Sequence, residues 1–549
     1  MVESIYFLKP LGAGTILPAS GGKRAYSPLS RATAFRRWFV TFNQTVTGAK
    51  GAANNQLNAQ AAFLMGLPAN VAKSLQWEML PGYNWQYGWF IRDRWQATGK
   101  LTLSFGLRYE VYPLMTRAGR GGIEWWDSGT NLILLGGAGG VPQDVGITTS
   151  HTLFAPRMGL AYRIKPSTVI RSGYGLTYMP EPLLSQMRGS YPLTIAQTYT
   201  GANSYVPYAP IEQGIPFFQG PPPGVGQVPL PATVLFKNYS ERHVKRGYVQ
   251  SWNLTLERTL PADIVVSAAY VGDVTIDGFA YYNANAAGPG TGTAGQPFVP
   301  PFGRTAETDY FNGMYGANYH SLQSTISRRL SQGLLLKGAY TFSKAIDITD
   351  SEGGLTFSYG PVRSRNRALA GYDVPQVLQM AFVYELPYGR SKTFGTHGMA
   401  AAVLGGWQVN GLFSSYEGRP FNVTADAGSL NAPGNTQTAD QVKAQVQKIG
   451  SLQQFYDRSA FAPVTEARFG STGRTILRGP GVVNLNLGLF RSFTPRERLK
   501  VEFRAEAFNS TNTPHFSNPS GNASSGSFMQ ITSAAADQRN IRFGLRAAW

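Results

Sequence analysis

Apolar and polar residues alternate one by one along many stretches of this chain. The clearest stretch lies near the C-terminus, where apolar residues at 499, 501, 503, 505 and 507 alternate with Lys500, Glu502, Arg504 and Glu506. Successive side chains of a β-strand point to opposite faces, so this period of two predicts a strand with one apolar and one polar face. The same alternation over 100–113 and 155–165 predicts further strands of this kind.

Such segments recur through the chain and predict about fourteen strands. They lie at 34–45, 84–97, 100–113, 155–165, 168–179, 246–259, 262–273, 318–331, 333–346, 375–387, 404–417, 481–493, 498–510 and 538–549. Strands of globular proteins usually have about five or six residues, whereas a tilted membrane-spanning strand has about nine to eleven, as many of these do. We therefore expect an all-β fold, an antiparallel transmembrane β-barrel over 34–549, preceded by an irregular segment, 1–33.

Short and long connections alternate between the predicted strands. Short turns lie near 97–100, 165–167, 259–262, 331–333 and 494–497, and long connections at 114–154, 180–245, 274–317, 347–374, 418–480 and 511–537. Outer-membrane barrels have short periplasmic turns and long external loops. The long connections should therefore be external, including 431–441, with the last strand running inward. Proline-rich and glycine-rich stretches at 216–231 and 287–303 predict exposed, irregular loops.

The composition supports a membrane barrel. Charged residues make up 14% of the chain and aromatic residues 13%, whereas soluble proteins have about 25% charged residues. Aromatic side chains gather at predicted strand ends, as in the belts at membrane interfaces. No apolar run is long enough for a transmembrane helix, which needs about 18 residues. The net charge of +19 is scattered rather than clustered, so no nucleic-acid partner is expected.

Charged residues on the polar sides of the strands are candidates to face the lumen of the barrel. They are Arg108, Arg157, Arg163 and Arg171 in the first half and Lys500, Glu502, Arg504 and Glu506 near the end. An excess of arginine would raise the local concentration of anions in a water-filled pore. Contact with a plug domain and simple pairing across strands are the alternatives.

No catalytic, cofactor or metal motif is recognisable. The GKR at 22–24 and the GGAGG at 136–140 lack the remaining residues of a phosphate-binding loop, and the five histidines show no metal-ligand spacing. Asp347, Asp350 and Glu352 could offer oxygen ligands to Ca²⁺, but we interpret them as the solvated start of a loop. We expect no enzyme, no cofactor and no metal.

The C-terminal segment ends on an aromatic residue in phase with its strand pattern. Ile541, Phe543, Leu545 and Trp549 share one face of the predicted strand. This resembles the signal read by the outer-membrane assembly machinery, although tryptophan replaces the commoner phenylalanine. The assembly machinery and outer-membrane lipid are therefore expected partners.

Many segments, in the same order, resemble the Oar-like TonB-dependent receptors. They include IRDRWQATGKLTLSFGLRYE (91–110), FAPRMGLAYRI (154–164), YVQSWNLTLERTLPADIVVSAAYVG (248–272), NYHSLQSTISRRLSQGLLLKGAYTFSKAID (318–347), LGGWQVNGLFS (404–414), LRGPGVVNLNLGLFRSF (477–493) and FRAEAFNSTNTPHFSNP (503–519). The resemblance implies the outer membrane of a Gram-negative-type bacterium, a barrel of twenty-two strands and binding or uptake of an unidentified solute.

Family members begin with a signal peptide, a carboxypeptidase-regulatory-like domain, a TonB box and a plug, none of which is recognisable here. The resemblance therefore implies a C-terminal portion of the barrel, with TonB, ExbB and ExbD as partners only if a plug is supplied elsewhere. The last strand should then lack its neighbour unless the sheet closes on itself or pairs with a separate N-terminal half, because hydrocarbon cannot hydrate a free strand edge.

Two other functions remain open from the sequence. Fourteen strands could close into a stand-alone passive channel. A secreted adhesive or carbohydrate-binding β-protein could instead use the aromatic residues as stacking platforms. Dependence on detergent would separate this secreted protein from both barrels.

Overall fold

A computed structural model describes most of the chain. The described residues are 19–27, 37–49, 55–76, 82–117, 123–180, 191–192, 194–216, 224–350, 353–389, 392–496 and 499–548. Among these residues, no helix has the length and apolar character needed to cross a membrane.

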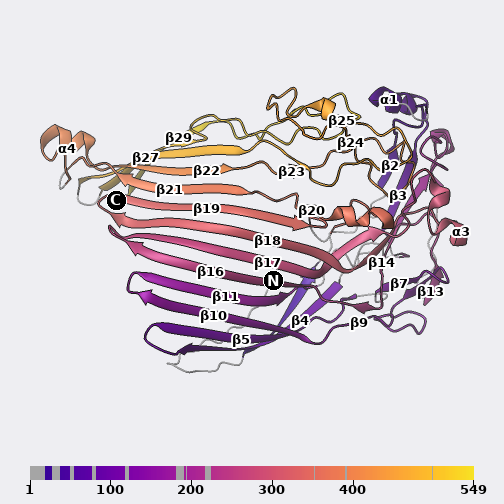
Figure 1. The fold of residues 1–549 in the computed structure, drawn as a ribbon, viewed down its shortest axis with the longest axis horizontal. Coiled ribbons are helices and arrows are strands. Elements are labelled where there is room, and N and C mark those ends of the chain that lie inside the picture. The colour runs from indigo at the N-terminus through magenta and orange to yellow at the C-terminus, as the bar shows by residue number, and fades with distance from the viewer. Residues whose placement is uncertain are drawn as a thin grey trace.

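The fold is a large antiparallel sheet whose strands follow one another in chain order (Figure 1). Each strand pairs with the next, so the long segments that alternate in sequence form neighbouring strands of a meander. The strands are β1 (Ala19–Ser27), β4 (Gly82–Gln96), β5 (Leu101–Val111), β10 (Leu153–Lys165), β11 (Thr168–Tyr178), β16 (Tyr248–Leu260), β17 (Ile264–Asn283), β18 (Thr308–Ser331), β19 (Leu334–Asp347), β21 (Gln376–Glu385), β22 (Trp407–Tyr416), β27 (Val482–Arg496), β28 (Leu499–Phe508) and β29 (Asn540–Ala548). The predicted all-β, antiparallel architecture is confirmed.

The connections gather by length at the two ends of the sheet. Short turns lie at one end, together with α4 (Gly398–Leu404) and the C-terminus, and the long connections lie at the other end (Figure 1). The last strand therefore runs from the long-loop end to the turn end, as expected. Among the described residues β29 pairs with β28 alone, and no pairing joins it to β1.

One predicted strand is wrong. The described part of the predicted strand at 34–45 contains β2 (Arg37–Thr41), but this strand lies outside the main sheet: it pairs with β3 (Asn70–Gln76), which also pairs with β12 (Thr194–Thr200). Five residues are too few to span a bilayer, which takes about nine to eleven. Strand β1 occupies the edge instead and pairs with β4 along its whole length, although it lies in the segment 1–33 that was expected to be irregular.

The cross-strand register gives the main sheet one apolar and one polar face. Directly paired residues share a face, and Leu322 pairs with Tyr270 and Phe342, while Gln323 on the other side pairs with Ala269 and Thr341. Following the pairs from strand to strand collects the apolar positions on one face, including Leu101, Leu103, Phe105 and Leu107 of β5. We call the two sides the apolar face and the polar face.

The long connections form a layer with its own cores, which we call the loop cap. It comprises the described residues of 37–76, 123–152, 191–247, 284–307, 353–375, 417–481 and 509–539. One core gathers Phe421, Phe455, Phe461, Phe528 and Met529, and another gathers Trp126, Ile195, Val228 and Phe236.

Short elements brace this layer. They are β7 (Glu124–Asp127), β8 (Leu132–Leu135), β9 (Thr148–Thr149), β13 (Gln227–Pro229), β14 (Phe236–Tyr239), β15 (His243–Val244), β20 (Ala368–Leu369), β23 (Pro420–Phe421), β24 (Asp440–Gln441), β25 (Phe461–Ala462), β26 (Leu477–Arg478), α1 (Gln56–Leu64), α3 (Val299–Phe302) and the 3₁₀ turns η1 (Ile211–Gln213), η2 (Thr293–Gly295), η3 (Gly360–Asn366) and η4 (Arg458–Ala460). β6 (Thr116–Arg117) lies outside this layer and pairs with β4.

The expectation of an exposed, irregular loop at 287–303 is also corrected. Phe298 and Phe302 from this stretch pack edge-on against Trp126, with ring centroids 4.9 and 6.4 Å away. Ala287 is fully buried in a third small cluster. Its apolar side chains therefore hold this stretch inside the loop cap. For the stretch 216–231, residues 217–223 lie outside the described part of the chain.

Candidate functional site

All the residues predicted to face a lumen lie on the polar face. The pairs Arg108 to Ala155, Arg157 to Gly175 and Arg171 to Thr255 place the first group together. Continuing the register to β28 and β29 places the second group on the same side. The eight residues are Arg108, Arg157, Arg163, Arg171, Lys500, Glu502, Arg504 and Glu506.

Several of these charges are paired within the sheet. Arg108 bonds Glu110, Arg504 bonds Glu502, and both terminal nitrogens of Arg171 reach Glu257 at 3.2 and 3.3 Å. Exposed pairs of this kind contribute about 1 kcal/mol or less. Arg171 pairs across two strands, whereas Arg108 and Arg504 each pair with a residue two positions away on their own strand. The polar face thus carries less free positive charge than its arginine count indicates.

The C-terminal residues lie on the apolar face of β29. Ile541, Phe543 and Leu545 pair with Ala507, Ala505 and Phe503 and are strongly exposed. This is the placement that an apolar membrane-facing strand requires. Trp549 lies outside the described residues.

A cavity of about 680 Å³ lies in the loop cap, at the loop-side ends of β17 and β18. Seven segments of the chain line it. They lie around residues 43, 70, 198–204, 281–283, 296–309, 354–358 and 427–436. Amide side chains are frequent among them: Asn43, Asn70, Asn203, Asn283, Gln296 and Asn435. Its volume falls within the range of about 300–1,000 Å³ typical of small-molecule sites.

Buried amides fix one wall of this cavity. The Gln296 Nε2 donates to the carbonyl oxygens of Asn285 and Thr305 at 3.0 and 3.1 Å. The fully buried Asn285 donates in turn to the carbonyl oxygens of Arg304 and Ala306. These bonds replace the strand pairing that the loop lacks, so the wall is held in one conformation.

Arg304 is a fully buried cation beside the same wall. Its guanidinium donates to the carbonyl oxygens of Pro231 and Val234 at 2.8 and 2.6 Å and to the Thr308 hydroxyl at 2.7 Å. Burial lowers the pKa of Arg304 to about 9, so it remains charged at neutral pH. Five donors in one planar group let Arg304 join residues 231–234 to residues 304–308.

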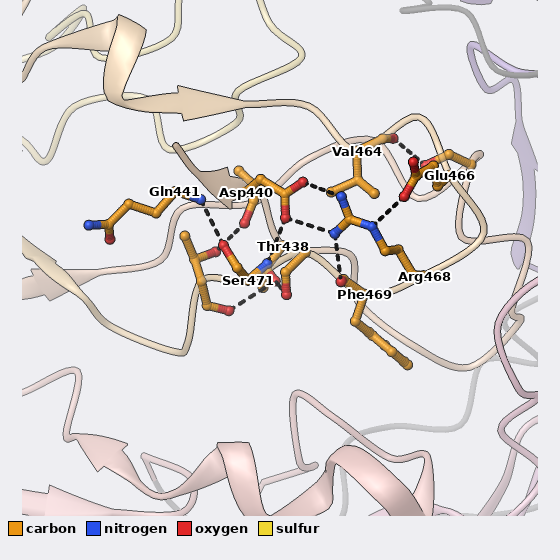
Figure 2. A network of polar contacts seen from close by, with 12 residues as sticks. Thr438, Asp440, Gln441, Val464, Glu466, Arg468, Phe469 and Ser471 are labelled. Carbon is orange, nitrogen blue, oxygen red and sulfur yellow. Dashed lines mark hydrogen bonds and ion pairs between the residues drawn. The ribbon is translucent and has the colours of Figure 1, made fainter. Parts of the chain in front are cut away.

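A second polar network holds the segment 427–441 in place (Figure 2). Arg468 binds Asp440 through two nitrogens, at 2.9 and 2.6 Å, and Glu466 through Nε at 2.6 Å. The Ser471 backbone N–H also donates to Asp440 at 2.9 Å. The network ties 440 to 466–471 and so supports the nearby cavity wall.

This network predicts a pH dependence of the loop cap. Hydrogen bonds from Arg468, opposed by partial burial, hold the pKa of Asp440 below its ordinary value. A lowered folded-state pKa stabilises the fold above the unfolded value of about 3.9, and this stabilisation is lost as the pH falls further. Protease cleavage within 437–471 should therefore be constant from neutral pH down to about 5 and rise below about 4. The Asp440→Asn variant should be cleaved faster than the wild type at neutral pH. An identical pH profile of cleavage for the wild type and the variant would contradict the role of Asp440.

Two further arginines anchor the segment 417–481 to the sheet. The buried Arg474 binds Asp347 at the end of β19 and also Asp350, and Arg478 binds Asp373. Asp347 and Asp350, which we considered as calcium ligands, are thus engaged by an arginine. Glu352 lies outside the described residues, and within the described part no group of acidic or histidine side chains could hold a metal ion.

The sequence did not predict the cavity. Its residues are asparagines, threonines and serines scattered over loops, a composition shared by ordinary turns. Only the return of each loop to the same end of the sheet brings them together.

Comparisons with known proteins agree with this architecture. The outer membrane beta barrel domain family matches residues 26–542. A search of curated proteins found no match. Among solved structures, the chain is similar to the pyoverdine-bound receptor FpvA of Pseudomonas aeruginosa, with 11% identity and a TM-score of 0.42 over 96% of this chain and 48% of that one.

The siderophore receptor PirA from Acinetobacter baumannii is similar at 8% identity and a TM-score of 0.43, over 97% of this chain and 55% of that one. The chain thus spans about half the length of these receptors. The family match covers nearly the whole chain and confirms the predicted localisation. This chain belongs to the outer membrane β-barrel domain family and is located in the outer membrane.

Proposed function

We propose that the chain forms the wall and the loop cap of an outer-membrane receptor that binds a solute at the cell surface and takes part in its uptake. The cavity in the loop cap carries this proposal, because segments from seven parts of the chain converge on it. It lies at the long-loop end, which is the external side in outer-membrane barrels. The Oar-like resemblance of the strand segments supports a role within the TonB-dependent receptors.

The polar face is proposed to line the route below the cavity. The eight charged residues that are candidates to face the lumen, the first of which is Arg108 and the last Glu506, would then face water or a plug. Energised transport through TonB, ExbB and ExbD further requires a plug domain. The structure supports binding and passage of a solute rather than catalysis, since its described polar clusters are salt bridges and loop contacts.

The alternatives are less well supported. A stand-alone passive channel needs the sheet to close, and in the described residues β29 and β1 are not paired. The secreted adhesive protein does not agree with the outer-membrane family.

The proposal predicts that filling the cavity abolishes binding. Thr436 lines the cavity and is exposed, so Thr436→Trp places a large ring in it without removing a buried side chain. Accumulation by whole cells should be measured for iron-labelled ferric citrate and ferric enterobactin and for fluorescent maltohexaose, cellohexaose and xylohexaose. Deleting the gene in its host should remove accumulation of at least one probe, and Thr436→Trp should reproduce this loss.

The matched control is Gln453→Trp, which adds the same ring at an exposed position of the same segment, outside the cavity. It should accumulate the probe normally. Equal accumulation of every probe in the wild-type and deletion strains would contradict the proposed function.

A further inference from the structure

The cavity of the loop cap has a distinctive charge. Its lining includes two acidic residues, Glu307 and Asp309, and no lysine, arginine or histidine among the described residues. The other polar groups are neutral amides and hydroxyls, such as those of Asn70, Thr200 and Thr356. The buried Lys237 lies behind this lining, 3.4 Å over the Tyr281 ring and opposite Asp309 in the register of β14 and β18. No cation of the described residues belongs to the lining itself, so an anion placed here would lose hydration without a cationic partner in the cavity wall.

A buried acceptor in the lining is left without a hydrogen bond. Gln296 is 2% exposed, and its Nε2 already donates to two carbonyl oxygens, which fixes the orientation of the amide. Its Oε1 has no hydrogen-bond partner among the described residues. A buried acceptor without a partner costs about 1–3 kcal/mol.

A donor in the lining complements this acceptor. The Oδ1 of Asn283 accepts from the backbone N–H groups of Asn285 and Thr308, at 2.9 and 3.2 Å. This leaves its Nδ2, which lies against Gly434 of the cavity wall, as a donor to which no acceptor bonds in the described part of the chain. The lining therefore offers a donor with fixed orientation in Asn283, whereas the Gln296 acceptor is itself buried. A ligand hydroxyl can accept from the Asn283 amide.

We propose that this cavity binds a neutral, polyhydroxylated ligand, chemically an oligosaccharide, in preference to an anionic ferric chelate. This inference rests on the proposed function and names its substrate class. The hydroxyls of such a ligand match the amides and hydroxyls of the lining, and its neutrality avoids the two carboxylates. Binding of this kind depends on hydrogen bonds rather than on ion pairs.

The test is a titration of the purified full chain in detergent by calorimetry. The neutral probes are maltohexaose, cellohexaose, xylohexaose and mannohexaose, and the anionic probes are ferric citrate and ferric enterobactin. At least one neutral probe should bind, and its Kd should change less than about twofold between about 0.1 and 1 M salt, over which the Debye length falls from about 10 to about 3 Å. Thr436→Trp should abolish this binding.

A charge variant tests the selectivity directly. Thr200→Lys places a cation in the lining and should raise the affinity for ferric citrate at least about tenfold, a gain of about 1.4 kcal/mol, while the affinity for the uncharged probe changes less. Gln453→Lys makes the same change outside the cavity and should leave both unchanged. Anionic binding by the wild type that Thr436→Trp removes would overturn the substrate class and leave the receptor function standing. Failure of all neutral probes to bind would also overturn the substrate class. The receptor function is tested separately, by comparing probe accumulation in the wild-type and deletion strains.

Discussion

Replacing Leu322 by arginine is expected to remove most of the folded protein from the outer membrane. Leu322 lies near the middle of the stretch of β18 that pairs with β19, on the apolar face between Tyr270 and Phe342, and is 48% exposed. An arginine on the lipid face near the bilayer midplane costs about 2–4 kcal/mol. The folded fraction can be measured as the heat-modifiable band in electrophoresis of outer membranes.

Gln323→Arg is the matched control, because Gln323 is the next residue of the same strand and lies on the polar face. Its folded fraction should stay close to that of the wild type. If the two variants fold equally well, or if Gln323→Arg is the more damaging, the assignment of the two faces is wrong.

Replacing Arg304 by leucine is expected to loosen the loop cap while the strands below stay folded. The substitution leaves the carbonyl oxygens of Pro231 and Val234 and the Thr308 hydroxyl without this donor. With about 1–3 kcal/mol for each buried group that loses its partner, the loss is at least about 3 kcal/mol. Cleavage of 224–307 by a protease should therefore accelerate at least about a hundredfold, since each 1.4 kcal/mol is a factor of ten.

Arg539→Leu removes an exposed arginine just before β29 and serves as the control, with cleavage expected at the wild-type rate. Arg304→Lys keeps the charge but not the planar fork of donors. Its cleavage rate should therefore fall between those of Arg304→Leu and Arg539→Leu. Wild-type cleavage of Arg304→Leu would show that Arg304 does not hold the loop cap.

The strands of the main sheet could be predicted because each repeats a local signal. In β28, Val501 and Phe503 alternate with Glu502 and Arg504, and this pattern alone indicates a strand between lipid and a polar interior. The alternation of long and short connections then gave the side of each loop. Both predictions needed only neighbours in sequence.

The edge strand shows where this reasoning fails. Residues 37–41, RWFVT, have the stronger apolar character, whereas β1 contains Gly21, Gly22 and Lys23. Pairing decides between them: β1 lies beside β4 over nine residues, and β2 finds a partner within the loop cap. Such partners are distant in sequence, so no local pattern predicts them.

The residues of the candidate site also divide into those that a local sequence pattern predicts and those that it does not. The eight charged residues follow from strand period, and the register places them on the same face, four on β5, β10 and β11 and four on β28. The amides of the cavity carry no period, and the role of Gln296 depends on where Asn285 and Thr305 lie. The sequence therefore predicted the wall of the site better than its binding groups.

The loop cap also determines the order in which the molecule can fold. Trp126 and Asn238 exchange two hydrogen bonds although they are 112 residues apart, and Arg474 reaches Asp347 across 127 residues. Contacts so distant in sequence form slowly, because long loops must first be closed. The first contact needs the strands from β5 to β16 in register, and the second needs those from β19 to β27. Ligand binding by the loop cap is therefore a measure of correct barrel assembly as well as of the chemistry of the cavity.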